Sequence, residues 1–252
     1  MREHPNKLRS VFMGTPDFAA RSLEELIKKG MAPDLVFSQP SRRSGRGMLS
    51  QAPPVVDLAL AHEIPVEQPQ KASSEEAVKV LKEVNPDIII VVAYGELLKK
   101  EVLDIPAYGC INLHASLLPK YRGAAPIPWS IMMGETVTGV TTFFLDEGMD
   151  SGRMLLQEKI EIKSDDTSLS LTEKLADLGA RVLVKSIQII EKGDYKGIEQ
   201  YNKEVTFAPK IRKEHGCINW NDTAEQIVRH VRAMFPWPGT FSIWRTKRDL
   251  LF

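Results

Sequence analysis

Cysteine is scarce in this chain: among its 252 residues, only Cys110 and Cys217 are present. Two cysteines do not build a disulfide framework, and the histidines show no metal-ligand spacing that would complete a zinc site. We therefore expect a protein of a reducing compartment that needs no metal. Cys110 follows apolar neighbours and is interpreted as a small buried apolar side chain.

Long apolar runs and an excess of charge of one sign are also missing. No apolar run approaches the ~18 residues of a membrane span, and residues 1–5 lack a signal peptide's apolar core. The 33 basic side chains balance the 33 acidic ones, so nucleic-acid binding would depend on a local basic patch. These absences favour a cytoplasmic globular protein with no membrane partner.

A dinucleotide-binding fingerprint is absent as well. That fingerprint needs three spaced glycines directly after the first strand. Here Gly14 stands alone at that place, and the glycines at 45 and 47 do not lie between a strand and a helix. The sequence therefore argues against a nicotinamide-dependent dehydrogenase.

The first half of the chain alternates between strand and helix patterns. A β-branched run at residues 87–92 is typical of a central parallel strand covered on both faces. Thr15 is the expected N-cap of the first helix, and Ser73 with Glu76 predicts a capping box. Strands are predicted at residues 8–13, 34–38, 87–92 and up to 114, and helices at 16–29, 54–62 and 74–84. The pattern predicts a doubly wound, mostly parallel α/β sheet, which binds ligands beyond the carboxyl ends of its strands.

The second half is organised differently. Strands are predicted at residues 138–145, 154–162 and 241–244, and helices at 167–192, with a break at Gly179, and at 223–234. Residues 196–212 have no clear period and are interpreted as an extended linker. One helix and one strand cannot bury a core of their own. We therefore expect a main domain at 1–195, the linker at 196–212 and an incomplete, truncated second domain at 213–252.

The stretch 110–119 carries the most informative polar side chains. Alternate residues of a strand share a face, so Asn112 and His114 project together while Ile111 and Leu113 point into the core. An amide and an imidazole side by side can both hydrogen-bond one carbonyl oxygen, which suits stabilisation of negative charge on a carbonyl under attack. On this pair alone, a core histidine with an asparagine at a strand end is an equally weighted alternative.

Two loops are expected at the same edge of the sheet. Residues 145–152 form an acidic turn whose glycines allow close approach to a ligand, and residues 92–98 follow the central strand. A carboxylate near His114 would favour the charged imidazole, and Asp150 could take up the proton of an attacking amine through a water. A solvated hairpin loop is the alternative for the acidic turn.

Residues 41–47 form a basic, glycine-containing segment with Arg42, Arg43 and Arg46. Such a segment can wrap around a polyanion and become ordered on binding. A surface loop without a ligand is the alternative, which composition alone favours.

Together these motifs resemble the methionyl-tRNA formyltransferase branch of the 10-formyltetrahydrofolate-dependent formyltransferases over nearly the whole chain. Asn-x-His at 112–114 and Asp-x-Gly at 150–152 belong to the whole family, whereas Gly-Thr-Pro-Asp-Phe at 14–18 and Gly-Arg-Gly at 45–47 are more specific to the tRNA branch. The other matching pieces are residues 39–40, 91–95, 109–119, 121–127, 138–141 and 235–238.

The resemblance implies an enzyme that transfers the formyl group of 10-formyltetrahydrofolate to the α-amino group of methionine on initiator tRNA. It also implies a Rossmann-like formyltransferase fold and a C-terminal barrel-type domain. By resemblance, Asn112 and His114 stabilise the oxyanion, while Asp150 holds His114 and manages the proton. The folate would contact Ser116, Leu117, Leu118, Pro119, Ala93, Tyr94, Gly95 and Leu97. The tRNA would contact Arg42, Arg43, Arg46, Lys203 and Lys210. We expect a monomer.

The sequence departs from the family at two places. Family members usually carry lysines where this chain has Met48, Leu49, Ser50 and Val56. The family's C-terminal barrel is mostly absent, so we expect folate binding to survive better than tRNA binding. Formyl transfer to an amino sugar, hydrolysis of the donor, and an inactive folate- or RNA-binding product are the alternatives.

Overall fold

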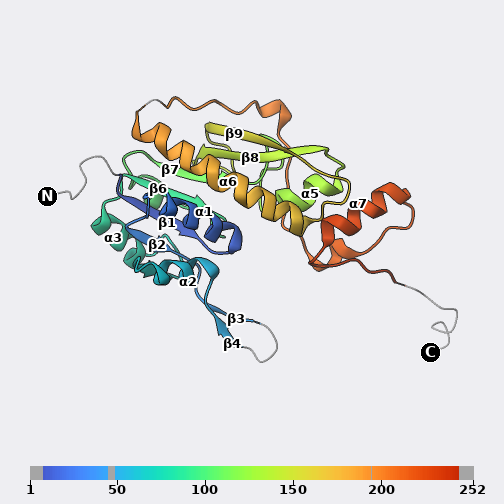
Figure 1. Cartoon of the computed structure of the whole chain (residues 1–252), viewed down its shortest axis with the longest axis horizontal. Coiled ribbons are helices and arrows are strands. Elements are labelled where there is room, and N and C mark those ends of the chain that lie inside the picture. The colour runs from blue at the N-terminus through green and yellow to red at the C-terminus, as the bar shows by residue number, and fades with distance from the viewer. Residues whose placement is uncertain (1–7, 45–48, 194, 244–252) are drawn as a thin grey trace.

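A mixed seven-stranded sheet forms the centre of the computed structural model, which describes residues 8–44, 49–193 and 195–243 (Figure 1). The strands, in the order in which they pair, are β5 (Val66–Glu67), β2 (Leu35–Phe37), β1 (Ser10–Gly14), β6 (Ile88–Val92), β7 (Cys110–His114), β8 (Val137–Phe144) and β9 (Met154–Glu161). All pairings from β5 to β7 are parallel, and β8 and β9 are antiparallel. The predicted doubly wound, mostly parallel sheet is confirmed.

Helices cover both faces of this sheet. They are α1 (Asp17–Lys28), α2 (Pro54–Ala61), α3 (Glu75–Val84), α4 (Lys100–Leu103), α5 (Pro126–Met132), α6 (Ser168–Glu191) and α7 (Ala224–Met234). One apolar core joins the sheet to α1, α2 and α6, and a second joins it to α3 and α4. Strand β6 supplies Ile88, Ile90 and Val92 to the first core and Ile89 and Val91 to the second. Both its faces are therefore buried, as its β-branched run predicts.

Strand β7 divides its side chains between the two faces as the period of two predicts. Ile111 and Leu113 join the core beneath α6, which leaves Asn112 and His114 on the opposite face. Helix α6 passes Leu113 at Gly179, where an added Cβ would lie 2.7 Å from Cδ2 of Leu113. The predicted break at Gly179 is wrong, because α6 is continuous and the glycine serves close packing against β7.

Two predicted caps are displaced by one residue. Pro16 is the N-cap of α1, and the Thr15 hydroxyl instead donates to the carbonyl of Tyr94 over 3.0 Å. Ser74, not Ser73, caps α3, and its hydroxyl accepts from the backbone N–H of Ala77. In both cases the true position depends on where the chain leaves the preceding loop, which the local pattern does not specify.

The basic segment is a hairpin rather than an irregular loop. Its strands are β3 (Arg42–Ser44) and β4 (Leu49–Gln51), which pair antiparallel and project from the body of the molecule (Figure 1). Residues 45–48, and with them Arg46, lie outside the described part of the chain.

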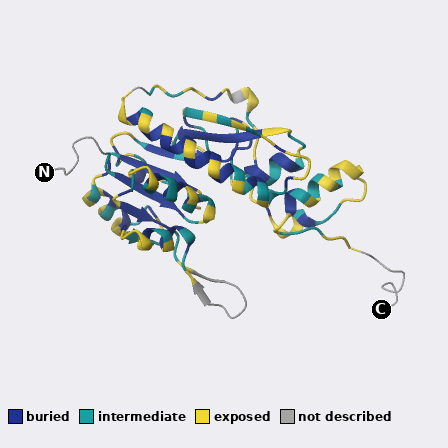
Figure 2. Ribbon diagram, in the orientation of Figure 1, coloured by how far each residue is buried: buried dark blue, intermediate teal, exposed yellow. Residues whose placement is uncertain are grey.

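The linker returns along the β9 edge of the sheet and leads into α7 (Figure 1). It contains the 3-10 helix η1 (Asn202–Glu204), and a second 3-10 helix, η2 (Lys213–Gly216), follows it. Helix α7 packs against α5, and its Ala233 and Met234 are buried in the core that lies under α6. The second domain therefore shares the core of the first, while the outer side of α7 is exposed (Figure 2).

The strand predicted at 241–244 is wrong over its described part. Phe241 makes a single bridge with Cys217, and residues 242–243 pair with no described strand. Trp244 lies outside the described residues. Among the helices that the structure describes, none has the length and apolar character needed to cross a membrane.

Candidate active site

The predicted trio of Asn112, His114 and Asp150 meets at the carboxyl end of β7. The Nδ1 atom of His114 lies 3.7 Å from Oδ2 of Asp150, and both side chains are largely buried. Asn112 is half-buried on the same face of β7, and its amide makes no hydrogen bond with the described residues. The arrangement offers an uncommitted amide beside a histidine–carboxylate pair, which argues against a merely structural histidine.

The acidic turn is tightly fixed. Asp150 has a left-handed backbone with φ of 50°, and its Oδ2 accepts from the backbone N–H of Gly123 over 2.7 Å. Oδ1 of Asp146 accepts from the N–H of Gly148 and the hydroxyl of Ser151. A Cβ at Gly152 would collide with the carbonyl of Phe144, so only glycine fits there. The tip of the turn, residues 146–149, is exposed to solvent, while these contacts fix Asp150 and Gly152 against the body of the protein.

The imidazole of His114 has an oxygen acceptor at each ring nitrogen. Its Nε2 lies 2.9 Å from the carbonyl oxygen of Tyr121, so this nitrogen carries the proton and donates it. A second proton on Nδ1 would face the carboxylate of Asp150. The expectation that the ring presents a free N–H to a ligand is therefore not met in this structure. One of the two contacts must be given up before His114 can bind a substrate oxygen.

The turn after β7, which carries four predicted folate contacts, is held from beneath by β8 and β9. Thr141 donates to the carbonyl of Ser116 and accepts from the N–H of Leu118, and Gln157 donates to the carbonyl of Leu118. Ser116, Leu118 and Pro119 are buried and Leu117 is half-buried. A ligand at this turn would therefore meet Leu117 and backbone groups. Thr141 belongs to the matching piece 138–141 but was not predicted as part of the site, and Gln157 had no signature in the sequence.

The loop after β6 carries the other four predicted folate contacts. Ala93 and Gly95 have positive φ values of 45° and 92°, and both are exposed. The side chain of Tyr94 is buried, its hydroxyl has no hydrogen-bond partner among the described residues, and burial raises its pKa to about 12. Leu97 is 72% exposed, which is unusual for a large apolar side chain and leaves it free to cover a ligand.

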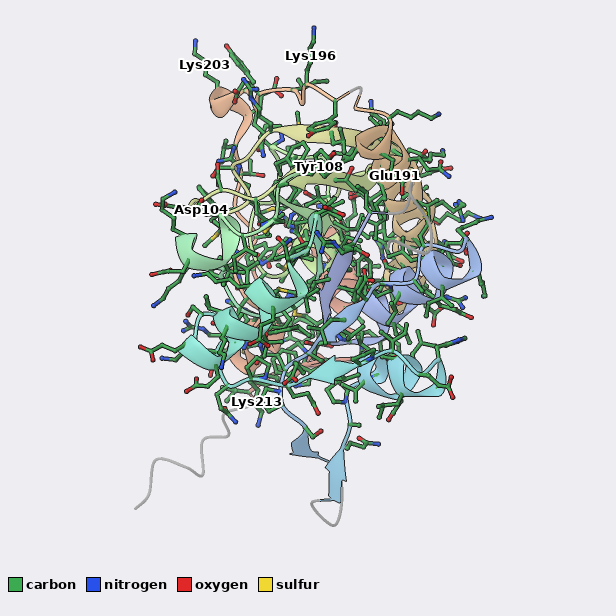
Figure 3. The ribbon with its side chains drawn as sticks, turned by 90° about the vertical axis from the view of Figure 1, so that its left-hand side faces the viewer. Asp104, Tyr108, Glu191, Lys196, Lys203 and Lys213 are labelled. Atoms are coloured by element: carbon green, nitrogen blue, oxygen red, sulfur yellow. The ribbon has the colours of Figure 1, made fainter. Side chains whose placement is uncertain are left out.

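The predicted tRNA contacts do not form one patch. Arg42 and Arg43 lie on β3, in the projecting hairpin. Lys203, in η1, and Lys210 are exposed, and Figure 3 shows Lys203 at the top of the view, at the end of the molecule opposite the hairpin. A polyanion that touches both the hairpin and the linker would have to extend across the protein.

Three residues of the site escaped prediction: Tyr121, Gly123 and the linker residue Gln200. The first two act through backbone atoms, which hold His114 and Asp150. The Gln200 side chain binds the carbonyls of Asp150 and Gly152. Contacts made by backbone atoms do not depend on the residue type, so the sequence could not indicate them, although residues 121–123 belong to the matching piece 121–127. Among the described residues, no three His, Cys, Asp or Glu side chains are arranged to hold a metal ion.

Comparisons with known proteins agree with this geometry. A family model described as "Formyl transferase" matches residues 8–187, and one described as "Formyl transferase, C-terminal domain" matches residues 210–252. The "Methionyl-tRNA formyltransferase" of Desulforamulus reducens is 48% identical over 240 residues, which are 95% of this chain and 76% of that protein. The protein of the same name from Thermodesulfovibrio yellowstonii is 47% identical, over 94% of this chain and 77% of that protein.

Solved structures show the same fold. The N-formyltransferase from Helicobacter canadensis in complex with folinic acid and dTDP-3-aminofucose gives a TM-score of 0.70 at 25% identity, over 90% of this chain and 80% of that chain. HypX from Aquifex aeolicus in complex with tetrahydrofolic acid gives a TM-score of 0.67 at 20% identity, over 93% of this chain and 36% of that chain. The second likeness concerns the fold alone.

Proposed function

Because the chain belongs to the formyl transferase family, we propose that it transfers the formyl group of 10-formyltetrahydrofolate to the α-amino group of methionine on initiator tRNA. It is a one-carbon transferase that serves translation initiation. The observation that carries the proposal is the uncommitted amide of Asn112 beside the His114–Asp150 pair, at the carboxyl end of β7. The named relatives supply the acceptor, because they match over most of their own length.

The trio performs two tasks in this reaction. When the amine attacks the formyl carbon, the carbonyl oxygen gains negative charge, and the N–H groups of Asn112 and His114 stabilise it. A new C–N bond forms to the amine, and the bond between the formyl carbon and the donor nitrogen breaks. Asp150 takes the amine proton through a water, and the proton passes to the departing nitrogen. His114 enters this step by turning its Nε2 proton away from the Tyr121 carbonyl.

The substrates bind at two surfaces. The folate lies against the turn at 116–119 and the loop at 93–97, where Leu97 covers its aromatic part. The tRNA contacts Arg42, Arg43 and Arg46 on one side and Lys203 and Lys210 on the other. Residues 1–195 form the catalytic domain, 196–212 the linker and 213–252 a tRNA-binding domain. We further propose that the chain works as a monomer in the cytoplasm, where charged initiator tRNA is available.

Single-turnover formylation of methionyl-tRNA at high enzyme concentration tests the proposed function, because it reports chemistry even when the acceptor binds weakly. We expect formyl-methionyl-tRNA to form and a nucleotide-linked amino sugar to remain unmodified. Faster transfer to the amino sugar would contradict the proposal that methionyl-tRNA is the acceptor. Folate binding without formyl transfer to either acceptor would contradict the proposal that the chain is an active transferase.

A further inference from the structure

Gln200 belongs to the linker, yet its side chain is buried and bonded at both ends. Its Nε2 donates to the backbone carbonyls of Asp150 over 2.7 Å and Gly152 over 2.8 Å. Its Oε1 accepts from Nε of Arg122 over 3.0 Å and from Nη2 over 2.7 Å. These four hydrogen bonds use both donors and both lone pairs of a primary amide.

The two carbonyls that Gln200 binds directly follow the point where the backbone adopts a left-handed conformation. Asp150 has φ of 50°, a value that is unfavourable for a residue with a Cβ and persists only where the surroundings enforce it. The carboxylate of this residue lies beside His114. A shift of the 150–152 backbone would therefore move the carboxylate away from the imidazole.

The other end of Gln200 reaches the second segment that holds Asp150. The guanidinium of Arg122 is buried and makes no ion pair with the described residues, so Gln200 supplies its oxygen acceptor. The next residue, Gly123, donates its N–H to Oδ2 of Asp150. One linker side chain thus joins the segment that carries the carboxylate to the segment that binds it.

Neighbouring linker residues strengthen the same junction. The Thr206 hydroxyl accepts from the N–H of Tyr121, and its carbonyl accepts from the N–H of Arg122. The N–H of Ala208 donates to the carbonyl of Arg122. Because Tyr121 also supplies the carbonyl that binds His114, the linker holds the supports of both His114 and Asp150.

We infer that Gln200 is a positioning residue for Asp150, and that the linker is thereby a built-in part of the catalytic centre. This inference rests on the proposed role of Asp150. Gln200 touches neither substrate; it acts through the backbone of the acidic turn. A displacement on the scale of 1 Å at a reacting group is sufficient to lower a rate about 100-fold.

The variants Gln200→Glu and Gln200→Ala test the inference, with Glu199→Gln as the matched control. Gln200→Glu keeps an acceptor for Arg122 but loses the donors to the two carbonyls, whereas Gln200→Ala loses all four bonds. Glu199 is the adjacent residue, and its exposed carboxylate pairs with Arg153 at the surface. We expect kcat to fall 10- to 100-fold in both Gln200 variants, KM for folate and tRNA to stay within about 3-fold, and the control to match the wild type.

NMR spectra of the His114 ring at one fixed pH, on protein that far-UV circular dichroism shows to be folded, separate positioning from general destabilisation. We expect the ring resonances of His114 to move in the Gln200 variants, because the Asp150 carboxylate beside the ring is displaced, and to stay in place in Glu199→Gln. Unmoved resonances overturn the inference whatever the activity, and so does an unchanged kcat. If the wild type itself forms no product, the proposed function fails, and the NMR comparison alone decides whether Gln200 positions Asp150.

Discussion

At the scale of single residues, the geometry of Asp150 makes its charge the decisive property. Asp150→Asn keeps an oxygen that can accept from the N–H of Gly123 and removes the negative charge beside His114. We expect the single-turnover rate of formylation to fall about 10²- to 10⁴-fold, the usual range for a lost acid–base group. Folate affinity, measured by a fluorescence titration, should change little, because the substitution leaves the folate contacts in place.

Asp146→Asn is the control for this substitution. Asp146 lies in the same turn, is exposed, and accepts hydrogen bonds from Gly148 and Ser151. We expect it to retain at least about half of the wild-type rate, since its charge faces solvent. Equal losses in the two variants would show that the turn matters only as a structural unit, and would contradict the assigned role of Asp150.

The sequence predicted the trio but not its supports. Because alternate residues of a strand share a face, Asn112 and His114 lie on the same side of β7. The turn after the next strand, β8, returns the chain to this side and places Asp150 beside His114. The supports are the backbone carbonyl of Tyr121 and the backbone N–H of Gly123. Nearly every residue has these two groups, so the residue type does not indicate which of them will hold the site. For the same reason the present orientation of the His114 ring could not be predicted.

At the scale of elements, the contact between α6 and β7 links helix packing to the site. Gly179→Ala places a Cβ 2.7 Å from Cδ2 of Leu113, the neighbour of His114 in β7. Overpacking of this kind costs about 1–3 kcal/mol, against roughly 1 kcal/mol gained from the higher helix propensity of alanine. We expect a loss of about 1 kcal/mol in the free energy of unfolding in urea, and a larger loss for Gly179→Val.

Arg181 is exposed on the same helix, so Arg181→Ala serves as the control and should leave the free energy of unfolding nearly unchanged. Stabilisation by Gly179→Ala would mean that Leu113 moves aside at no cost.

The start of α6 has a pH-sensitive anchor in Asp166. Burial by itself raises the pKa of Asp166, but hydrogen bonds from Lys174, Ser170 and the backbone of Lys163 outweigh it and lower the pKa. A carboxyl whose pKa is lower in the folded state stabilises that state above the unfolded pKa of about 3.9. The contribution is lost as the pH falls through the lower, folded value.

Thermal unfolding between pH 7 and pH 2.5 checks this expectation. Asp166→Asn should lower Tm at pH 7 and flatten the decline of Tm below about pH 4. Asp165→Asn is the control, because the neighbouring carboxylate is exposed. An undiminished acid decline in Asp166→Asn would assign the acid sensitivity to other carboxylates.

Element types followed from the sequence more reliably than element ends. The β-branched run of β6 and the apolar face of α7 each identify an element that the structure contains. The cap of α3 was misplaced because Ser73 and Ser74 are both chemically able to cap, whereas α1 begins after Pro16 with no side-chain cap at all. The hydroxyl of Thr15 is instead engaged by Tyr94 in a tertiary contact.

At the scale of the whole molecule, balanced charge means that tRNA affinity depends on a few local cations. For Lys203→Ala we expect the slope of log K against log salt to lessen by about 1, the loss of one phosphate contact. Filter binding at several salt concentrations measures this slope. Lys79→Ala, which removes an exposed lysine of α3, should leave the slope unchanged. Equal changes in both variants would indicate general electrostatics instead of a local contact.

The sheet could be predicted except for its short edge strand β5, whereas the docking of the linker could not be predicted. Alternating strands and helices determine the parallel part of the sheet through local patterns. The linker makes its contacts with residues far away along the chain, such as Thr206 with Tyr121 and Gln200 with Arg122. These contacts are hydrogen bonds of side chains and backbone groups in a segment whose sequence has no periodic pattern. The sequence therefore predicted only that residues 196–212 are an extended linker.

The pairing of the linker with residues 121–125 also sets an order of events during synthesis. The bond between Gln200 and Asp150 spans 50 positions. At about 5–20 residues per second, a ribosome needs roughly 2.5 to 10 seconds to add that many residues. A nascent chain that already displays Asn112, His114 and Asp150 therefore waits several seconds before Gln200 and Thr206 emerge to align them. Activity should begin abruptly, late in elongation, rather than grow with chain length.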